Sequence, residues 1–79
     1  MNEGRLWLIK GEPQAGIESA IDYYFLKYGI EFDAVMVRED VAKSLDGRLK
    51  IKVVGDDTIP PSHALFVGER NVQLEDEST

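Results

Sequence analysis

The sequence predicts a small α/β (α+β) domain in which one long helix packs on one face of a mixed four-stranded sheet. Residues 13–28 carry apolar side chains at a helical period, and four other segments are short, apolar and bounded by turn residues. The chain of 79 residues is long enough for one domain and too short for two. We therefore expect a strand–helix–strand–short helix–strand–strand order over residues 1–70, followed by a disordered acidic tail over residues 71–79.

The first strand and the long helix have the clearest signals. Within residues 5–10, the apolar side chains of residues 6–9 occupy both parities, as in a central strand covered on both faces. Pro13 suits the first turn of a helix, because the N–H that proline lacks has no helical partner there. Gly29 is expected to end the helix in a left-handed conformation. The apolar stripe of this helix comprises Ile17, Ile21, Tyr24, Phe25 and Tyr28.

The remaining elements follow in order. Residues 34–38 and 63–67 are apolar strands, and residues 49–53 alternate apolar residues with lysine, as in a strand with one wet face. Residues 41–45 follow Asp40, a possible cap, and predict a short helix, although the turn at Asp46-Gly47 leaves open a hairpin between the second and third strands. We expect the first two strands to run parallel around the long helix, and the last two to be antiparallel to each other.

One face of this sheet is expected to lack a covering helix. Period-2 alternation places inward a set made up of Leu6, Leu8, Val35, Val37, Ile51, Val53, Leu65 and Val67. The opposite face then holds Trp7, Ile9, Met36 and Phe66, beside Lys50 and Lys52. A contiguous apolar patch on a sheet usually marks an interface, so these six residues are the predicted interaction surface. The alternative is that residues 41–45 and 59–61 fold across this face.

Charge bears on the class of partner. The net charge is −6, which argues against general nucleic-acid binding, because such binding depends on Lys and Arg that neutralise phosphates. Four basic residues nevertheless gather within ten positions: Lys43, Arg48, Lys50 and Lys52. They form either a local patch for nucleic acid or an acidic partner, or a solvated strand whose lysines prevent edge pairing. The second interpretation is favoured, since no exposed aromatic residues interleave with them.

No motif in the sequence predicts catalysis, a cofactor or a metal. The spacing of Gly11 and Gly16 matches a phosphate-binding loop, but the Lys and Ser or Thr of that motif are missing and Glu12 would repel a phosphate. Asp56, Asp57 and His63 lack the spacing of a metal site. Ser62 and His63 are adjacent at a strand entry, so they are expected to point apart rather than to act together.

The expected location is the cytoplasm. The chain has no cysteine, so disulfides cannot reinforce it. The apolar run over residues 6–9 is too short for a signal-peptide core or a membrane span, so no membrane association is expected.

Several segments resemble small uncharacterised prokaryotic proteins of unknown function. The similar parts are residues 22–29 (DYYFLKYG), residues 35–40 (VMVRED), Ile59-Pro60-Pro61 with His63, and residues 65–68 (LFVG). The resemblance covers about two-thirds of the chain and its motifs are structural, so it implies a similar small α/β fold and no activity, cofactor or functional residue.

These observations favour a non-enzymatic interaction or accessory module that self-associates as a homodimer or binds another protein. One alternative is a binder of an anionic small molecule, at the start of the long helix or between the sheet and the lysines. Another is a nucleic-acid accessory protein that uses the four basic residues.

Overall fold

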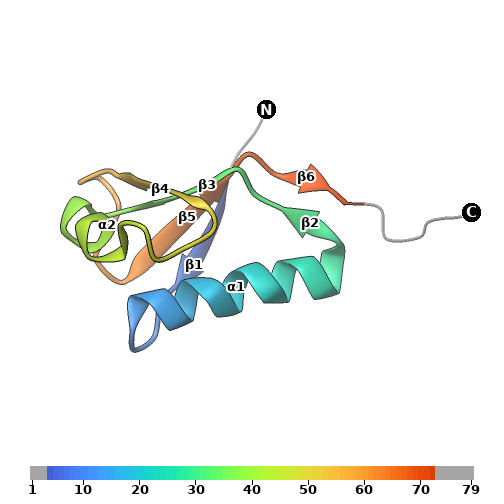
Figure 1. Ribbon diagram of the computed structural model, residues 1–79, viewed down its shortest axis with the longest axis horizontal. Coiled ribbons are helices and arrows are strands. Elements are labelled where there is room, and N and C mark those ends of the chain that lie inside the picture. Colours follow the sequence, from blue (N-terminus) through green and yellow to red (C-terminus); the bar gives the residue numbers. More distant parts are fainter. Residues whose placement is uncertain (1–3, 73–79) are drawn as a thin grey trace, which may run out of the picture.

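The computed structural model describes residues 4–72 and confirms the predicted fold class (Figure 1). A long helix packs under a four-stranded mixed sheet, and a two-stranded ribbon lies beyond one end of that sheet. In chain order the elements are β1 (Arg5–Leu8), α1 (Pro13–Tyr28), β2 (Ile30–Glu31), β3 (Ala34–Val37), α2 (Glu39–Leu45), β4 (Lys52–Gly55), β5 (His63–Val67) and β6 (Arg70–Asn71).

Helix α1 begins and ends where its signals predict. Pro13 occupies the first turn, and the Glu12 side chain accepts a hydrogen bond from the Ala15 N–H at 3.3 Å. Gly29 ends the helix with φ 66°, and its N–H donates to the Phe25 carbonyl at 2.9 Å. Only a residue without a Cβ adopts this left-handed conformation at little cost.

The sheet has the strand order β1-β5-β3-β4. Strand β5 is antiparallel to both of its neighbours, whereas β3 and β4 pair in parallel. The first two predicted strands, β1 and β3, therefore run in the same direction, but β5 separates them. The adjacent parallel strands are β3 and β4, joined through α2, which excludes the hairpin alternative for residues 34–53.

The structure differs from the prediction most at the third strand and at the C-terminal end of the fold. The third strand is β4, shifted from residues 49–53 to 52–55, where Gly55 lies under α2. A Cβ on Gly55 would lie 3.1 Å from the Glu39 Cα, so glycine allows the close approach of this helix. The ribbon of β2 and β6 was not predicted. It includes Asn71, and the Val72 N–H donates to the Gly29 carbonyl, so the fold extends past residue 70. Residues 73–79 of the predicted tail lie outside the described residues.

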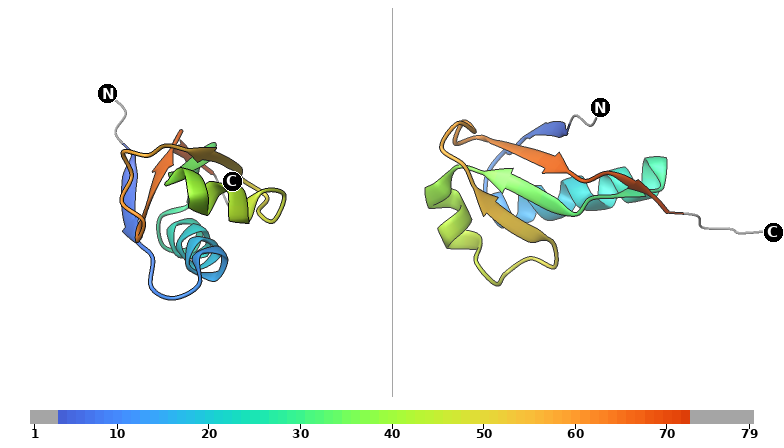
Figure 2. Two further views of the ribbon diagram at one scale, coloured as in Figure 1. Left: turned by 90° about the vertical axis from the view of Figure 1, so that its left-hand side faces the viewer. Right: turned by 90° about the horizontal axis from the view of Figure 1, so that it is seen from above.

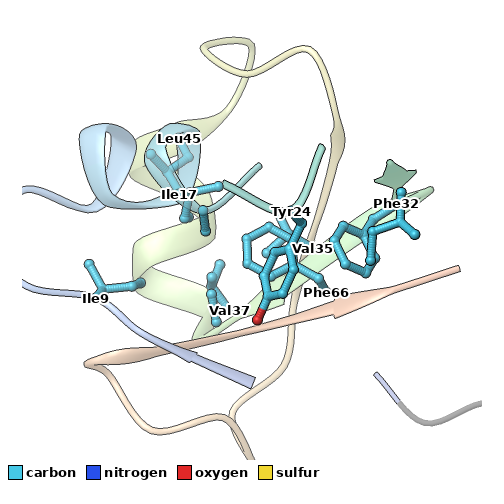
Figure 3. Close-up of a cluster of buried hydrophobic side chains, with 11 residues drawn as sticks. Ile9, Ile17, Tyr24, Phe32, Val35, Val37, Leu45 and Phe66 are labelled. Atoms are coloured by element: carbon cyan, nitrogen blue, oxygen red, sulfur yellow. The ribbon is translucent and has the colours of Figure 1, made fainter. Parts of the chain in front are cut away.

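Both helices pack on the same face of the sheet and enclose one core (Figure 3). The largest fully buried side chains come from both helices and two strands: Phe66, Ile17, Leu45, Val35 and Val37. Phe66 also packs against aromatic residues of α1 and of the segment that follows it. Its ring centroid lies 5.1 Å from that of Phe32. The core thus depends on the central strands β3 and β5.

The faces of β1 and β5 are the reverse of those predicted. Phe66 pairs with Val35 in the register, and both are fully buried against the helices. On β1, Trp7 packs against the same core, whereas Leu6 and Leu8 point to the other side. Because both strands are apolar at both parities, hydrophobicity alone does not fix the register. The large aromatic rings bury the most area beneath α1, which explains the side they take.

Candidate functional site

The candidate site is the outer face of the sheet, defined as the face opposite the two helices. Viewed from above, the strands lie in front of α1 (Figure 2). The register places Leu65 beside both Leu6 and Met36, and Met36 beside Val54, all at positions that alternate with buried ones. The apolar members of the outer face are Leu6, Leu8, Ala34, Met36, Val54, Leu65 and Val67.

The exposed part of the outer face lies on β1. Leu6 is 57% exposed and Leu8 is 49% exposed, whereas Leu65 and Met36 on the inner strands are partly buried. This difference arises because β1 is at the edge of the sheet and has only β5 beside it. Leu6 and Leu8 point to the same side of an uncovered strand and together make a contiguous exposed apolar area, the kind of surface that marks contact sites.

The sequence left open that residues 41–45 and 59–61 fold across this face, but they do not cover Leu6 and Leu8. Helix α2 packs on the side of the core through Leu45. The loop before β5 is held at its two ends, since the Asp56 N–H donates to the Val37 carbonyl and the Ser62 carbonyl accepts from the Ile9 N–H. Ile59 of this loop is buried outside the core cluster, yet Leu6 and Leu8 stay about half exposed. Within residues 4–72, Leu6 and Leu8 therefore remain accessible.

The six predicted interface residues are divided between the two sides. Met36 and Lys52 lie on the outer face, because they alternate with Val35 and Val53. Ile9 and Phe66 are in the core, and Trp7 is half-buried against it, so these three residues do not form the uncovered patch. Lys50 precedes β4 and lies beside α1. The outward positions that the prediction assigned to Trp7, Ile9 and Phe66 are occupied instead by Leu6, Leu8 and Leu65. No signal in the sequence distinguishes the two parities of these strands.

Trp7 belongs to an aromatic cluster under the C-terminal half of α1. Its ring centroid lies 5.6 Å from those of Tyr23 and Tyr24. Tyr24 is the centre of the cluster and is also within 5.4 Å of Phe32. Burial raises the pKa of the Tyr24 hydroxyl, so it stays neutral. These contacts fix β1 against the helix and hold its leucines on the other side.

Two cationic side chains lie over aromatic rings of this cluster. The Arg5 guanidinium lies 5.5 Å from the Tyr24 ring centroid and hydrogen-bonds Glu69, with Nε to Oε1 at 2.9 Å. That hydrogen bond raises the pKa of Arg5 and lowers the pKa of Glu69. Lys27 lies 5.4 Å from the Tyr23 ring centroid, and its ammonium lowers the pKa of the Tyr23 hydroxyl. The Arg5 contact ties the start of β1 to α1, whereas the Lys27 contact lies within the last turns of α1.

The four basic residues do not form one patch. Lys43 lines a hollow of about 300 Å³ that it shares with Glu39 and Asp46. Arg48 and Lys50 line a different hollow of about 320 Å³, opposite Glu18 and Asp22 of α1. Lys52 is exposed on the edge strand β4. Since acidic side chains face three of the four, this arrangement is unsuited to binding a phosphate backbone.

The N-terminus of α1 offers little to an anion. The Glu12 carboxylate already accepts the N–H of Ala15, and the Glu12 carbonyl accepts the N–H of Gly16. A second negative group there would be repelled by Glu12, as the sequence predicts.

Ser62 and His63 lie closer together than alternation predicts. The Ser62 Oγ is 3.3 Å from the His63 Nδ1, because Ser62 precedes β5 and is not held to its alternation. This separation is long for a hydroxyl hydrogen bond. No carboxylate in residues 4–72 hydrogen-bonds the ring, so the pair lacks the group that orients a catalytic base.

The Asp56 carboxylate stabilises the turn in which Asp56 lies. Its Oδ1 accepts from the Thr58 N–H at 2.9 Å and from the Thr58 hydroxyl at 2.7 Å, which lowers the pKa of Asp56. In the described part of the chain, no three His, Asp or Glu side chains gather as a metal site.

The comparisons with known proteins add no relative. No protein-family model matches the chain, and neither a curated protein nor a solved structure shows significant similarity to it. Among residues 4–72, neither helix has the length and apolar character that a bilayer span requires.

Proposed function

We propose that this chain is a non-enzymatic protein-interaction module that associates with a second copy of itself through the β1 end of the outer face. The observation that carries the proposal is the exposure of Leu6 and Leu8, at 57% and 49%, on a sheet face without a helix above it in residues 4–72. Burial of such surface is the main driving force for association between proteins.

The size of the domain supports the same proposal. A chain of 79 residues buries only about 60% of the surface that its unfolded form exposes, so its core alone gives modest stability. Association adds apolar burial that a small domain cannot obtain within one copy. The proposal places this module in the cytoplasm, in line with a composition that has no cysteine.

The first test is sedimentation equilibrium of the full chain over a broad dilution series. We expect the weight-average mass to rise from monomer to dimer with concentration. A mass equal to that of the monomer at every concentration would contradict self-association. A partner of different sequence would then be sought by adding candidate proteins to the same experiment.

A further inference from the structure

The two free edges of the sheet are not equivalent. Strand β4 forms one edge and carries the exposed Lys52, a residue type that discourages pairing with another strand. Strand β1 forms the other edge, and after Arg5 it contains only Leu6, Trp7 and Leu8. It thus has neither a lysine nor a proline, and its most exposed residues are Leu6 and Leu8. Its one charged side chain, Arg5, is paired with Glu69 and lies over the Tyr24 ring. Of the two edges, only β1 is open to strand addition.

The hydrogen bonds at the end of β1 show which backbone groups are free. The Ile9 N–H donates to the Ser62 carbonyl at 2.7 Å, so the peptide groups of Ile9 face β5. In an antiparallel pair these groups alternate sides along the strand. The N–H and C=O groups of Trp7 therefore also point toward β5. The N–H and C=O groups of Leu6 and Leu8 point the other way, toward the open edge of the sheet.

We propose that two copies pair through their β1 strands in antiparallel fashion, around a two-fold axis at Trp7. This inference rests on the proposed function and names the geometry of its partner. The pairing places Leu6 opposite Leu8 of the second copy, and Leu8 opposite its Leu6. It joins two sheets of four strands into one sheet of eight. A two-fold axis makes both halves of the contact identical.

Other registers fit less well. A two-fold axis that passes between two residues places a residue whose peptide groups point to the open edge opposite one whose peptide groups point to β5. The two β1 strands then form no hydrogen bonds. An axis at Leu6 leaves Leu8 opposite Gly4, and an axis at Leu8 leaves Leu6 opposite the exposed Lys10. Only the axis at Trp7 gives each leucine a leucine partner and uses the outward peptide groups of both residues.

The register can be tested by cross-linking, because the chain contains no cysteine. Leu6→Cys and Leu8→Cys are made as two separate variants, and one of them is isotope-labelled. Each variant alone, and an equal mixture of the two, is then treated with a short cross-linker that joins two thiols. Directly opposed Cβ atoms lie about 5 Å apart and diagonal ones about 7–8 Å apart. We expect the mixed product to exceed both homodimeric products by more than random pairing of the two variants would give, because only the mixed pair is directly opposed. Leu26→Cys, on the exposed side of α1, is the matched control and should give no dimeric product.

Each outcome has a distinct meaning. Excess of the Leu6→Cys homodimer or of the Leu8→Cys homodimer would overturn the axis at Trp7 in favour of a neighbouring register. Cysteine variants that sediment as dimers at the concentration used but give no cross-link at either position would overturn edge pairing and leave self-association standing. A wild-type chain that stays monomeric would overturn the proposed function as well.

A second measurement needs no substitution. Trp7 is the only tryptophan, and the proposed axis brings it against the Trp7 of the other copy. Its fluorescence should therefore change with dilution along the same curve as the mass. A spectrum that is constant while the mass changes would also contradict the proposed register.

Discussion

Replacing Leu8 by lysine should separate association from folding. The side chain is 49% exposed in the single chain, so association can bury about half of it. Full burial of a leucine contributes about 1.5–3 kcal/mol, so this half amounts to about 1 kcal/mol. A symmetric dimer contains the residue twice, which gives about 2 kcal/mol, or a dissociation constant about thirtyfold higher.

The same substitution should destabilise the single chain only slightly. The single chain already buries about half of Leu8, and the aliphatic stem of lysine keeps part of that contact, so the free energy of unfolding should fall by about 1 kcal/mol or less. Sedimentation equilibrium measures the first effect, and urea unfolding followed by circular dichroism measures the second. Leu26→Lys is the matched control, because Leu26 is 79% exposed on α1, away from the sheet.

Two results would refute this reasoning. Association of Leu8→Lys at wild-type strength would mean that the β1 end of the outer face is not the contact. Equal weakening by Leu26→Lys would mean that the effect comes from added charge rather than from the place of the leucine.

Three further predictions concern the fold. Phe66→Ala should lower the free energy of unfolding by about 3–5 kcal/mol in urea titrations, since the ring is fully buried; a change below about 1 kcal/mol would contradict its place in the core. Gly68→Ala should lower the melting temperature more than Gly11→Ala. Both glycines have positive φ (76° and 79°), but a Cβ at Gly68 would lie 2.6 Å from the Asp33 Cβ, whereas the space at Gly11 is open, and equal shifts would refute the clash. The ion pair lowers the pKa of Glu69 in the folded state, so its contribution to stability is present above the usual pKa of 4.5 and is lost as the pH falls through the lowered value. Glu69→Gln should flatten that part of the acid unfolding curve, and an unchanged curve would show that the pair adds nothing.

The sequence was most informative where local signals agree. Helix α1 has proline at its start, glycine past its end and a regular apolar stripe between them, and its bounds match the prediction. Strand β5 also matches, since Gly68 ends it. The short helix α2 was predicted, but a hairpin remained possible because the turn at Asp46-Gly47 serves both arrangements.

The sequence was least informative about the two sides of the sheet. Leu6, Trp7, Leu8 and Ile9 are all apolar, so either parity satisfies the hydrophobic pattern. The choice depends on the aromatic residues of α1, which contact β1 only in three dimensions. On β1 and β5 the side chains that point away from the helices are therefore those of the parity opposite to the one predicted, and Leu6 and Leu8 are the exposed ones among them.

The central position of β5 has a consequence for the synthesis of this chain. Strand β1 has β5 as its only neighbour in the sheet, and Arg5 pairs with Phe66 near the other end of the described chain. While the ribosome is still making the segment before His63, β1 has no strand to join, and both of its edges are open. Contacts between such distant residues also form slowly, because a long loop must close first. The leucines of β1 are thus exposed to neighbouring chains before the domain can fold, and an attached chaperone or rapid completion of β5 would protect them.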